Sequence, residues 1–181
     1  RTASGVMITA SHNPKDYNGF KAYGPDGGQL APEASDIVVA AIGGFDMFGD
    51  ITMVGDGQLE SSPLFHWIGS EVDNAFLDAV QCQSLNPDIV AQVSDDFKLV
   101  YTPFHGTGLR PVTEILKRIG VKHVIVEPHQ AVADPDFSTV KSPNPEDMEG
   151  FALATELAKR EGATIIVGTD PDADRVGVVV R

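Results

Sequence analysis

The sequence predicts an α/β protein with mixed, mainly parallel sheets and helices on both faces, and three observations support this fold class. Across residues 97–181, short runs of β-branched residues alternate with stretches of helical periodicity, and strands that alternate with helices of this length favour a parallel sheet. The chain of 181 residues is 42% hydrophobic and 22% charged, which is typical of a globular protein with a core. Turn-forming clusters such as SHNP and GPDGGQ follow the apolar runs.

The first 63 residues predict a small unit of two strands and a helix. GVMITAS at residues 5–11 is a predicted strand that ends in the turn SHNP, and GFKAY at residues 19–23 is a second predicted strand. A helix is expected to begin at Pro32, because proline suits the first helical position, and to stop at Gly43 and the glycine after it. Residues 45–63 show no clear period, so we interpret them as a connector or an exposed hairpin.

Later elements are predicted from their periodicity. Residues 68–83 have apolar side chains at three-and-four spacing, which predicts a helix, and a domain boundary is expected within residues 86–96. The predicted strands are residues 99–102, 123–127, 164–169 and 176–180, and the predicted helices are residues 110–119 and 150–161. Ligands of such sheets bind beyond the carboxyl ends of the strands, which directs attention to loops 103–109, 128–148 and 170–175.

Charge and composition exclude several classes of protein. The chain has 13 Lys and Arg against 26 Asp and Glu, a net charge of −13, which argues against binding nucleic acid through phosphate contacts. No apolar run approaches the roughly 18 to 20 residues that cross a bilayer, so no membrane partner is expected. Cys82 is the only cysteine and cannot form an internal disulfide. A cytoplasmic location is therefore expected.

The motif TDPDADR is the strongest chemical signal, and it directly follows a predicted buried strand. In an extended chain, Asp170, Asp172 and Asp174 would share one side, with about 7 Å for each step of two residues. Crowded carboxylates repel one another unless a cation lies among them. Oxygen ligands suit Mg²⁺, Mn²⁺ or Ca²⁺, and three of them leave coordination positions for a substrate oxygen. An acidic turn that faces water is the alternative.

Two other classes of protein have motifs that begin like TDPDADR. A calcium-binding EF-hand loop that started at Asp170 would need glycine at its sixth position, where this chain has Arg175, so this interpretation is rejected. A haloacid-dehalogenase-type phosphotransferase would use Asp170 as its nucleophile. That family usually has Thr or Val where this chain has Asp174. It is kept as an alternative.

Two further motifs carry polar groups at predicted turns. TASHNP places Ser11 beside His12, but neighbouring strand residues point to opposite faces and no GxSxG elbow is present, so serine hydrolase chemistry is not expected. FHGTG precedes a helix, where an anion could bind, which makes His105 and Gly106 candidates for phosphate binding. Taken alone, each motif is simply a turn, and Lys21 alone is a solvated lysine.

Together these strings resemble the α-D-phosphohexomutase superfamily. The matching strings occur in the family's order: GVMITASHNPKDYNGFKAYGPDGGQ, PFHGTG, SPNPE and GTDPDADR. The resemblance implies sheets of the phosphohexomutase domain type. It further implies that Ser11 is the phosphoserine, and that the three aspartates of residues 170–174 bind one Mg²⁺ together with the Ser11 phosphate. It also places Arg175, His12 and Lys21 in the active centre, with Lys21 as an acid–base group.

The implied activity is the interconversion of sugar 1-phosphates and 6-phosphates through a bisphosphate intermediate, with a hexose 1,6-bisphosphate as activator. YNGFKAY and the proline in DPDADR favour the phosphoglucomutase and phosphopentomutase branch, and a phosphomannomutase is an alternative. A non-catalytic metal-binding piece is the alternative of another class.

The resemblance also implies a domain organisation. Residues 1–45 would end the family's first domain and carry the phosphoserine loop, residues 46–96 would be a connector and helix, and residues 97–181 would be most of the second domain. The third and fourth domains, which hold the sugar phosphate, would be missing. Both ends are therefore expected to be cut, and this chain alone is expected to show little mutase activity.

Overall fold

The computed structural model describes residues 2–55, 57–93 and 95–180, and the chain divides into two compact units. The first unit consists of Arg1–Ile8 and Phe20–Gly69, and the second of Thr9–Gly19 and Ser70–Arg181. The serine-containing loop thus groups with the later part of the chain. The predicted domain limits at residues 45 and 96 stay a prediction.

The first unit is a strand pair followed by a helix. Strand β1 (Gly5–Ile8) pairs antiparallel with β2 (Phe20–Tyr23), and helix α1 (Pro32–Ile42) follows. β1 is shorter than the predicted strand, because Ser11 has a φ of 53° and lies in a turn. α1 has proline in its first turn and ends at a glycine, as the sequence predicted. The described residues of 45–63 form turns and no strand, so they do not form the exposed hairpin that was one of the two expectations, and their role as a connector stays a prediction.

The second unit contains a four-stranded sheet with the order β4-β3-β5-β6. Its strands are β3 (Lys98–Thr102), β4 (His123–Val126), β5 (Ile165–Thr169) and β6 (Val176–Val180). β3 is parallel to both of its neighbours, whereas β6 is antiparallel to β5. The prediction of a mixed, mainly parallel sheet is therefore confirmed.

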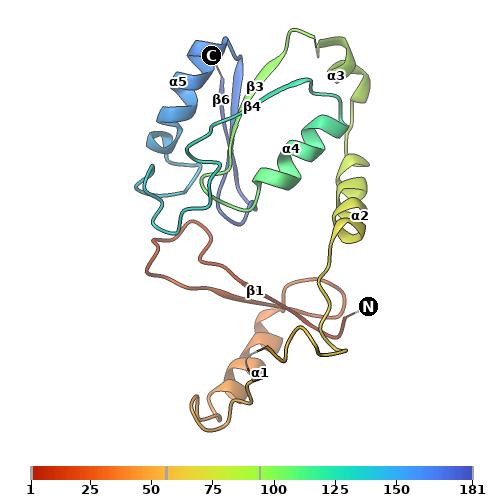
Figure 1. Cartoon of the computed structure of the whole chain (residues 1–181), viewed down its shortest axis with the longest axis vertical. Coiled ribbons are helices and arrows are strands. Elements are labelled where there is room, and N and C mark those ends of the chain that lie inside the picture. Colours follow the sequence, from red (N-terminus) through yellow and green to blue (C-terminus); the bar gives the residue numbers. More distant parts are fainter. Residues whose placement is uncertain (1, 56, 94, 181) are drawn as a thin grey trace. The chain divides into compact units, whose positions relative to one another are not determined.

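Helices cover the sheet of this unit from both sides (Figure 1). The helices of this unit are α2 (Ser70–Gln81), α3 (Pro87–Val93), α4 (Leu109–Arg118) and α5 (Ala152–Glu161), with the short 3₁₀ helix η1 (Met148–Phe151) before α5, and α2 packs against α4. Figure 1 shows α5 on one side of the sheet and α4 on the other. α3 was not predicted, because a helix of seven residues is too short to show a clear apolar period. None of the described helices is long and apolar enough to cross a bilayer.

One row of side chains across the sheet forms the core beneath α5. The row runs through Ile125, Val100, Ile166 and Val179, one residue from each strand in register. It packs against a cluster of buried residues from η1, α5 and the neighbouring loops: Phe104, Phe151, Ala154, Leu157, Ala158 and Ala163. Leu99 and Tyr101 alternate with Val100 along β3 and are also buried. β3 is therefore covered on both faces, as expected for a central parallel strand.

A buried polar network fixes the long loop after β4 to the sheet. The Gln130 side chain accepts a hydrogen bond from the Thr102 hydroxyl at 2.6 Å and donates one to the Gly150 carbonyl at 3.0 Å. The Gln130 backbone N–H donates to the Glu127 carboxylate at 2.6 Å. Buried polar groups are stable only when they are bonded in this way. The network therefore fixes the position of the loop at the carboxyl ends of the parallel strands.

Candidate functional site

The acidic motif forms the loop between β5 and β6. Because β6 runs antiparallel to β5, this is a hairpin loop, and it lies beyond the carboxyl end of β5. The Ala173 N–H donates to the Asp170 carbonyl at 3.0 Å, and Ala173 has a φ of 60°. The loop is therefore turned and not extended. The predicted step of about 7 Å between the aspartates is wrong, because it assumed an extended chain.

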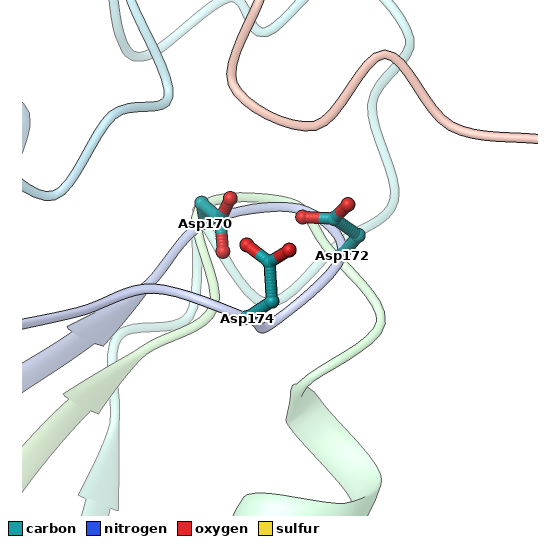
Figure 2. A group of neighbouring side chains, drawn as sticks. All are labelled: Asp170, Asp172 and Asp174. Carbon is teal, nitrogen blue, oxygen red and sulfur yellow. The ribbon is translucent and has the colours of Figure 1, made fainter. Parts of the chain in front are cut away.

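The turned loop brings the three carboxylates together. Asp170, Asp172 and Asp174 each offer one oxygen, and these oxygens all lie within 4.8 Å of one another. Figure 2 shows their side chains turned toward a common space. Their exposure increases along the loop, since Asp170 is buried, Asp172 half-buried and Asp174 exposed. This set of hard oxygen donors fits a divalent cation such as Mg²⁺ or Mn²⁺, with one side open to an additional ligand.

The ionisation of Asp170 reflects its surroundings. Burial raises the pKa of the Asp170 carboxyl above its ordinary value, and the adjacent Asp172 carboxyl raises it further. Two hydrogen bonds oppose the rise in pKa. The backbone N–H of Arg175 donates to Oδ1 at 3.0 Å, and the Ser11 hydroxyl donates to Oδ2 at 3.0 Å. A bound divalent cation would stabilise the ionised form, which burial alone disfavours.

The structure brings Ser11 to the acidic loop, although Ser11 and Asp170 are separated by 159 positions in the sequence. Ser11 Oγ also lies 3.1 Å from Nδ1 of His12. The expectation that neighbouring residues here would point to opposite faces is wrong, because Ser11 lies in a turn with a positive φ. The single hydroxyl proton goes to Asp170, so His12 Nδ1 donates to Ser11 Oγ in this arrangement.

Thr9 links the same two segments, and it was not predicted as a site residue. Its hydroxyl accepts a hydrogen bond from the Ser11 backbone N–H at 2.9 Å and donates one to Asp172 Oδ2 at 3.2 Å. The Thr9 N–H donates to the Gly19 carbonyl at 3.1 Å, which closes the loop of residues 9–19. The sequence feature that could have indicated Thr9 is the hydroxyl residue two positions before the serine in TASHNP.

Arg175 lies at the end of the acidic loop, and its guanidinium contacts Glu146. The distance from Nη1 of Arg175 to Oε1 of Glu146 is 3.1 Å, which forms an ion pair. Glu146 belongs to the SPNPE string, for which no chemistry was predicted. Lys21 lies in β2 of the first unit, where it is opposite Met7 in the ladder, and its role stays a prediction.

His105 has both ring nitrogens engaged in hydrogen bonds. Nδ1 lies 2.8 Å from the Val132 carbonyl and Nε2 lies 2.7 Å from the Thr139 hydroxyl, while only 7% of the residue is exposed. The His105 N–H donates to the Gln130 carbonyl at 2.7 Å. In this structure His105 therefore fastens the loop of residues 130–139. Its predicted role in phosphate binding stays a prediction.

The rest of the FHGTG turn packs against the acidic loop. The Pro171 carbonyl accepts two hydrogen bonds from Thr107, one from the backbone N–H at 2.8 Å and one from the hydroxyl at 3.0 Å. A Cβ atom at Gly106 would collide with the Pro171 backbone. Gly106 is thus required where the two loops approach closely. The contacts of Thr107 and Gly106 with Pro171 therefore hold the FHGTG turn beside the loop that carries the aspartates.

The fold and site together define an α/β protein in which a serine hydroxyl meets a loop of three carboxylates beyond a parallel strand. The family model described as "Phosphoglucomutase/phosphomannomutase, alpha/beta/alpha domain II" matches residues 74–181, and the corresponding model for domain I matches residues 1–44. The chain belongs to the phosphoglucomutase/phosphomannomutase family, as the resemblance indicated. This membership sets aside the haloacid-dehalogenase alternative.

Similar proteins agree with this membership. A phosphoglucomutase of Staphylococcus epidermidis is 41% identical over 181 residues, which cover 98% of this chain and 32% of the relative. A phosphoglucomutase of Staphylococcus haemolyticus is 39% identical, with 100% and 32% covered. A crystal structure of a Thermus thermophilus protein assigned as a phosphomannomutase superposes with a TM-score of 0.71 at 25% identity, covering 98% of this chain and 36% of that one. The chain thus spans about a third of the length of the relatives it matches.

Proposed function

We propose that this chain supplies the phosphoryl-transfer part of a phosphoglucomutase, which interconverts glucose 1-phosphate and glucose 6-phosphate through a phosphoserine. The observation that carries the proposal is the hydrogen bond of 3.0 Å between the Ser11 hydroxyl and Asp170, beside two further carboxylates. The names of the Staphylococcus relatives support glucose as the sugar. Mannose and pentose phosphates are the alternative substrates within the family.

Asp170, Asp172 and Asp174 would hold one Mg²⁺, together with the phosphate on Ser11. The bound cation would neutralise charge on the phosphoryl oxygens. Within the chain, the backbone N–H of Arg175 holds Oδ1 of Asp170, and the Glu146 carboxylate fixes the Arg175 guanidinium at the edge of the loop. These contacts would keep the carboxylates in place before substrate binds.

The proposed reaction moves a phosphoryl group from Ser11 to the sugar and then from the sugar back to Ser11. In the forward step the bond between phosphorus and Ser11 Oγ breaks, a bond from phosphorus to a sugar hydroxyl oxygen forms, a base takes the hydroxyl proton, and Ser11 Oγ takes up a proton. The product is a hexose bisphosphate, which would account for activation by a hexose 1,6-bisphosphate. In the return step Ser11 Oγ loses its proton and bonds to the other phosphorus, the bond from that phosphorus to the sugar oxygen breaks, and the sugar oxygen takes up a proton. Asp170 and His12 are the groups within hydrogen-bond distance of Ser11 Oγ, and we assign Lys21 to the proton transfer on the sugar.

We further propose that the parts which bind the sugar phosphate lie in the family's third and fourth domains, outside this chain, so this chain alone would have little mutase activity. The protein would act in the cytoplasm on a small sugar phosphate, without a nucleic-acid or membrane partner. The net charge of −13 supports the exclusion of nucleic acid.

Mass spectrometry of the full-length protein tests the proposal. After incubation with glucose 1,6-bisphosphate and Mg²⁺, we expect one phosphate on the peptide that contains Ser11. It should be absent in Ser11→Ala and retained in the matched control Ser84→Ala, which changes an exposed serine. A hydroxylamine-labile phosphate on Asp170, or no phosphate at all, would contradict the proposal. Comparing kcat/KM for glucose, mannose and ribose 1-phosphates then identifies the sugar.

A further inference from the structure

The Thr9 hydroxyl joins the serine loop to the acidic loop through a single oxygen atom. It accepts the Ser11 N–H at 2.9 Å and donates to Asp172 Oδ2 at 3.2 Å. A carboxylate can only accept, so the one hydroxyl proton is directed to Asp172, and a lone pair remains for the Ser11 N–H. The hydroxyl therefore acts both as a donor and as an acceptor. The Thr9 side chain has no second polar atom that could replace it.

The backbone of Ser11 needs such support. Its φ of 53° lies in the left-handed region, which costs free energy for any residue with a Cβ and persists only where surrounding contacts hold it. The Thr9 hydroxyl is the partner of the Ser11 N–H in this conformation. Relaxation of Ser11 to a negative φ would change the position of its side chain, which donates to Asp170 in this conformation.

Thr9 is itself held in place by the rest of its loop. Its N–H donates to the Gly19 carbonyl at 3.1 Å, and a Cβ atom at Gly19 would collide with the Thr9 carbonyl oxygen. The two ends of the loop are thus packed backbone to backbone. The hydroxyl is presented from a fixed position, so it can fix the positions of Ser11 and Asp172 in turn.

We infer that Thr9 is a positioning residue for phosphoryl transfer at Ser11. It acts by orienting the Ser11 hydroxyl and one carboxylate of the acidic loop. This inference rests on the proposed function, because it assigns Thr9 to the same site. It adds a residue that neither the acidic motif nor the serine itself reveals.

Paired variants of the full-length protein test the inference. Thr9→Val keeps the shape and removes the hydroxyl, whereas Thr9→Ser keeps the hydroxyl and removes the methyl group. Loss of an outer-shell partner costs about 10- to 100-fold in metal affinity or activity. We expect this loss in kcat for Thr9→Val, with KM for glucose 1-phosphate almost unchanged, and recovery of most of the activity in Thr9→Ser. Thr52→Val, at an exposed threonine, is the matched control.

Binding of Mn²⁺, followed by electron paramagnetic resonance, is the second measurement, and it does not depend on turnover. We expect Thr9→Val to bind Mn²⁺ about 10-fold more weakly than wild type and Thr9→Ser to bind it nearly as well. Thr9→Ala serves as a second variant without the hydroxyl if Thr9→Val does not fold, as judged by circular dichroism.

The outcomes separate this inference from the proposed function. If the hydroxyl-free variants match wild type in kcat and in Mn²⁺ affinity, or if Thr9→Ser is as impaired as Thr9→Val, the inference is overturned. If wild-type protein takes up no phosphate on Ser11, the proposed function fails instead. In that case the Mn²⁺ titration still decides whether Thr9 positions the acidic loop.

Discussion

Asp170 is buried, and the proposed cation would require its carboxyl to be ionised. Burial and the neighbouring Asp172 carboxyl raise its pKa, so in metal-free protein its contribution favours the folded state at low pH and is lost as the pH rises through its folded pKa. A raised pKa of this kind is common among residues of functional sites, which supports the proposed role of Asp170.

Gly106 is the residue at which the FHGTG turn most closely approaches the acidic loop. We predict that Gly106→Ala destabilises the protein by about 1–3 kcal/mol, because its Cβ would displace the Pro171 backbone. Denaturant unfolding measures this change. Gly69→Ala is the matched control, since no atom lies within 4 Å of its added Cβ. Equal stability of the two variants would show that the loops do not pack as described.

Helix α5 supplies most of the cover for one face of the sheet, and its two leucines differ in burial. Leu157 is 6% exposed within the core cluster, and Leu153 is 37% exposed. We predict that Leu157→Ala lowers the free energy of unfolding by about 2–5 kcal/mol, and that Leu153→Ala lowers it by less. Denaturant unfolding of the pair checks this prediction. A larger loss for Leu153→Ala would mean that α5 presents another face to the sheet.

The contact between β3 and β5 predicts a dependence on alkaline pH. Burial raises the pKa of Tyr101 to about 12, although the hydrogen bond with the Thr169 hydroxyl at 2.8 Å opposes the rise. An unfolded tyrosine ionises near pH 10. The contribution of Tyr101 to stability is therefore fully present below about pH 10 and is lost as the pH rises toward about 12.

Tyr101→Phe tests this dependence, because phenylalanine cannot ionise. Between about pH 10 and 12, we expect the free energy of unfolding to fall less steeply in the variant than in wild type. Urea unfolding at a series of pH values measures both slopes. Identical slopes would show that Tyr101 ionises in the folded protein as readily as in the unfolded chain.

Most elements were predictable because each leaves a local pattern. The strands of the second unit are short β-branched runs, and α5 ends at Gly162, whose φ of 69° suits glycine. The short helix α3 leaves no such pattern. The antiparallel direction of β6 was not predicted either, because direction depends on the turn formed by residues 170–175 and not on the composition of the strand.

The net charge of −13 means that the negative charges of the molecule repel one another, and any cation screens this repulsion. A test for specific cation binding therefore needs a control at equal ionic strength. We predict that Mg²⁺ raises the midpoint of thermal unfolding beyond the effect of NaCl at equal ionic strength. At a free Mg²⁺ concentration of 100 times Kd, binding would raise the free energy of unfolding by about 2.7 kcal/mol. Asp170→Asn should abolish the extra stabilisation, and Asp88→Asn, at an exposed carboxylate, should retain it. A response to Mg²⁺ equal to that of NaCl would contradict a specific site.

The candidate site as a whole was predictable only in part. Sequence motifs pointed to Ser11, His12 and the three aspartates, and the structure brings these residues into one unit. Thr107 and Glu146 were missed because their partners, Pro171 and Arg175, are distant in sequence. Such contacts depend on how loops from three strands meet at one edge of the sheet, and no local pattern encodes that meeting.

The separation of Ser11 from Asp170 also has a consequence in time. A ribosome adds about 5–20 residues per second, so the 159 positions between them correspond to about 8–32 s of synthesis. Throughout that interval the nascent chain carries the serine without its carboxylate partner. The three aspartates, by contrast, emerge together within one hairpin and can assemble locally. The serine is therefore made first and meets its hydrogen-bond partner Asp170 only much later.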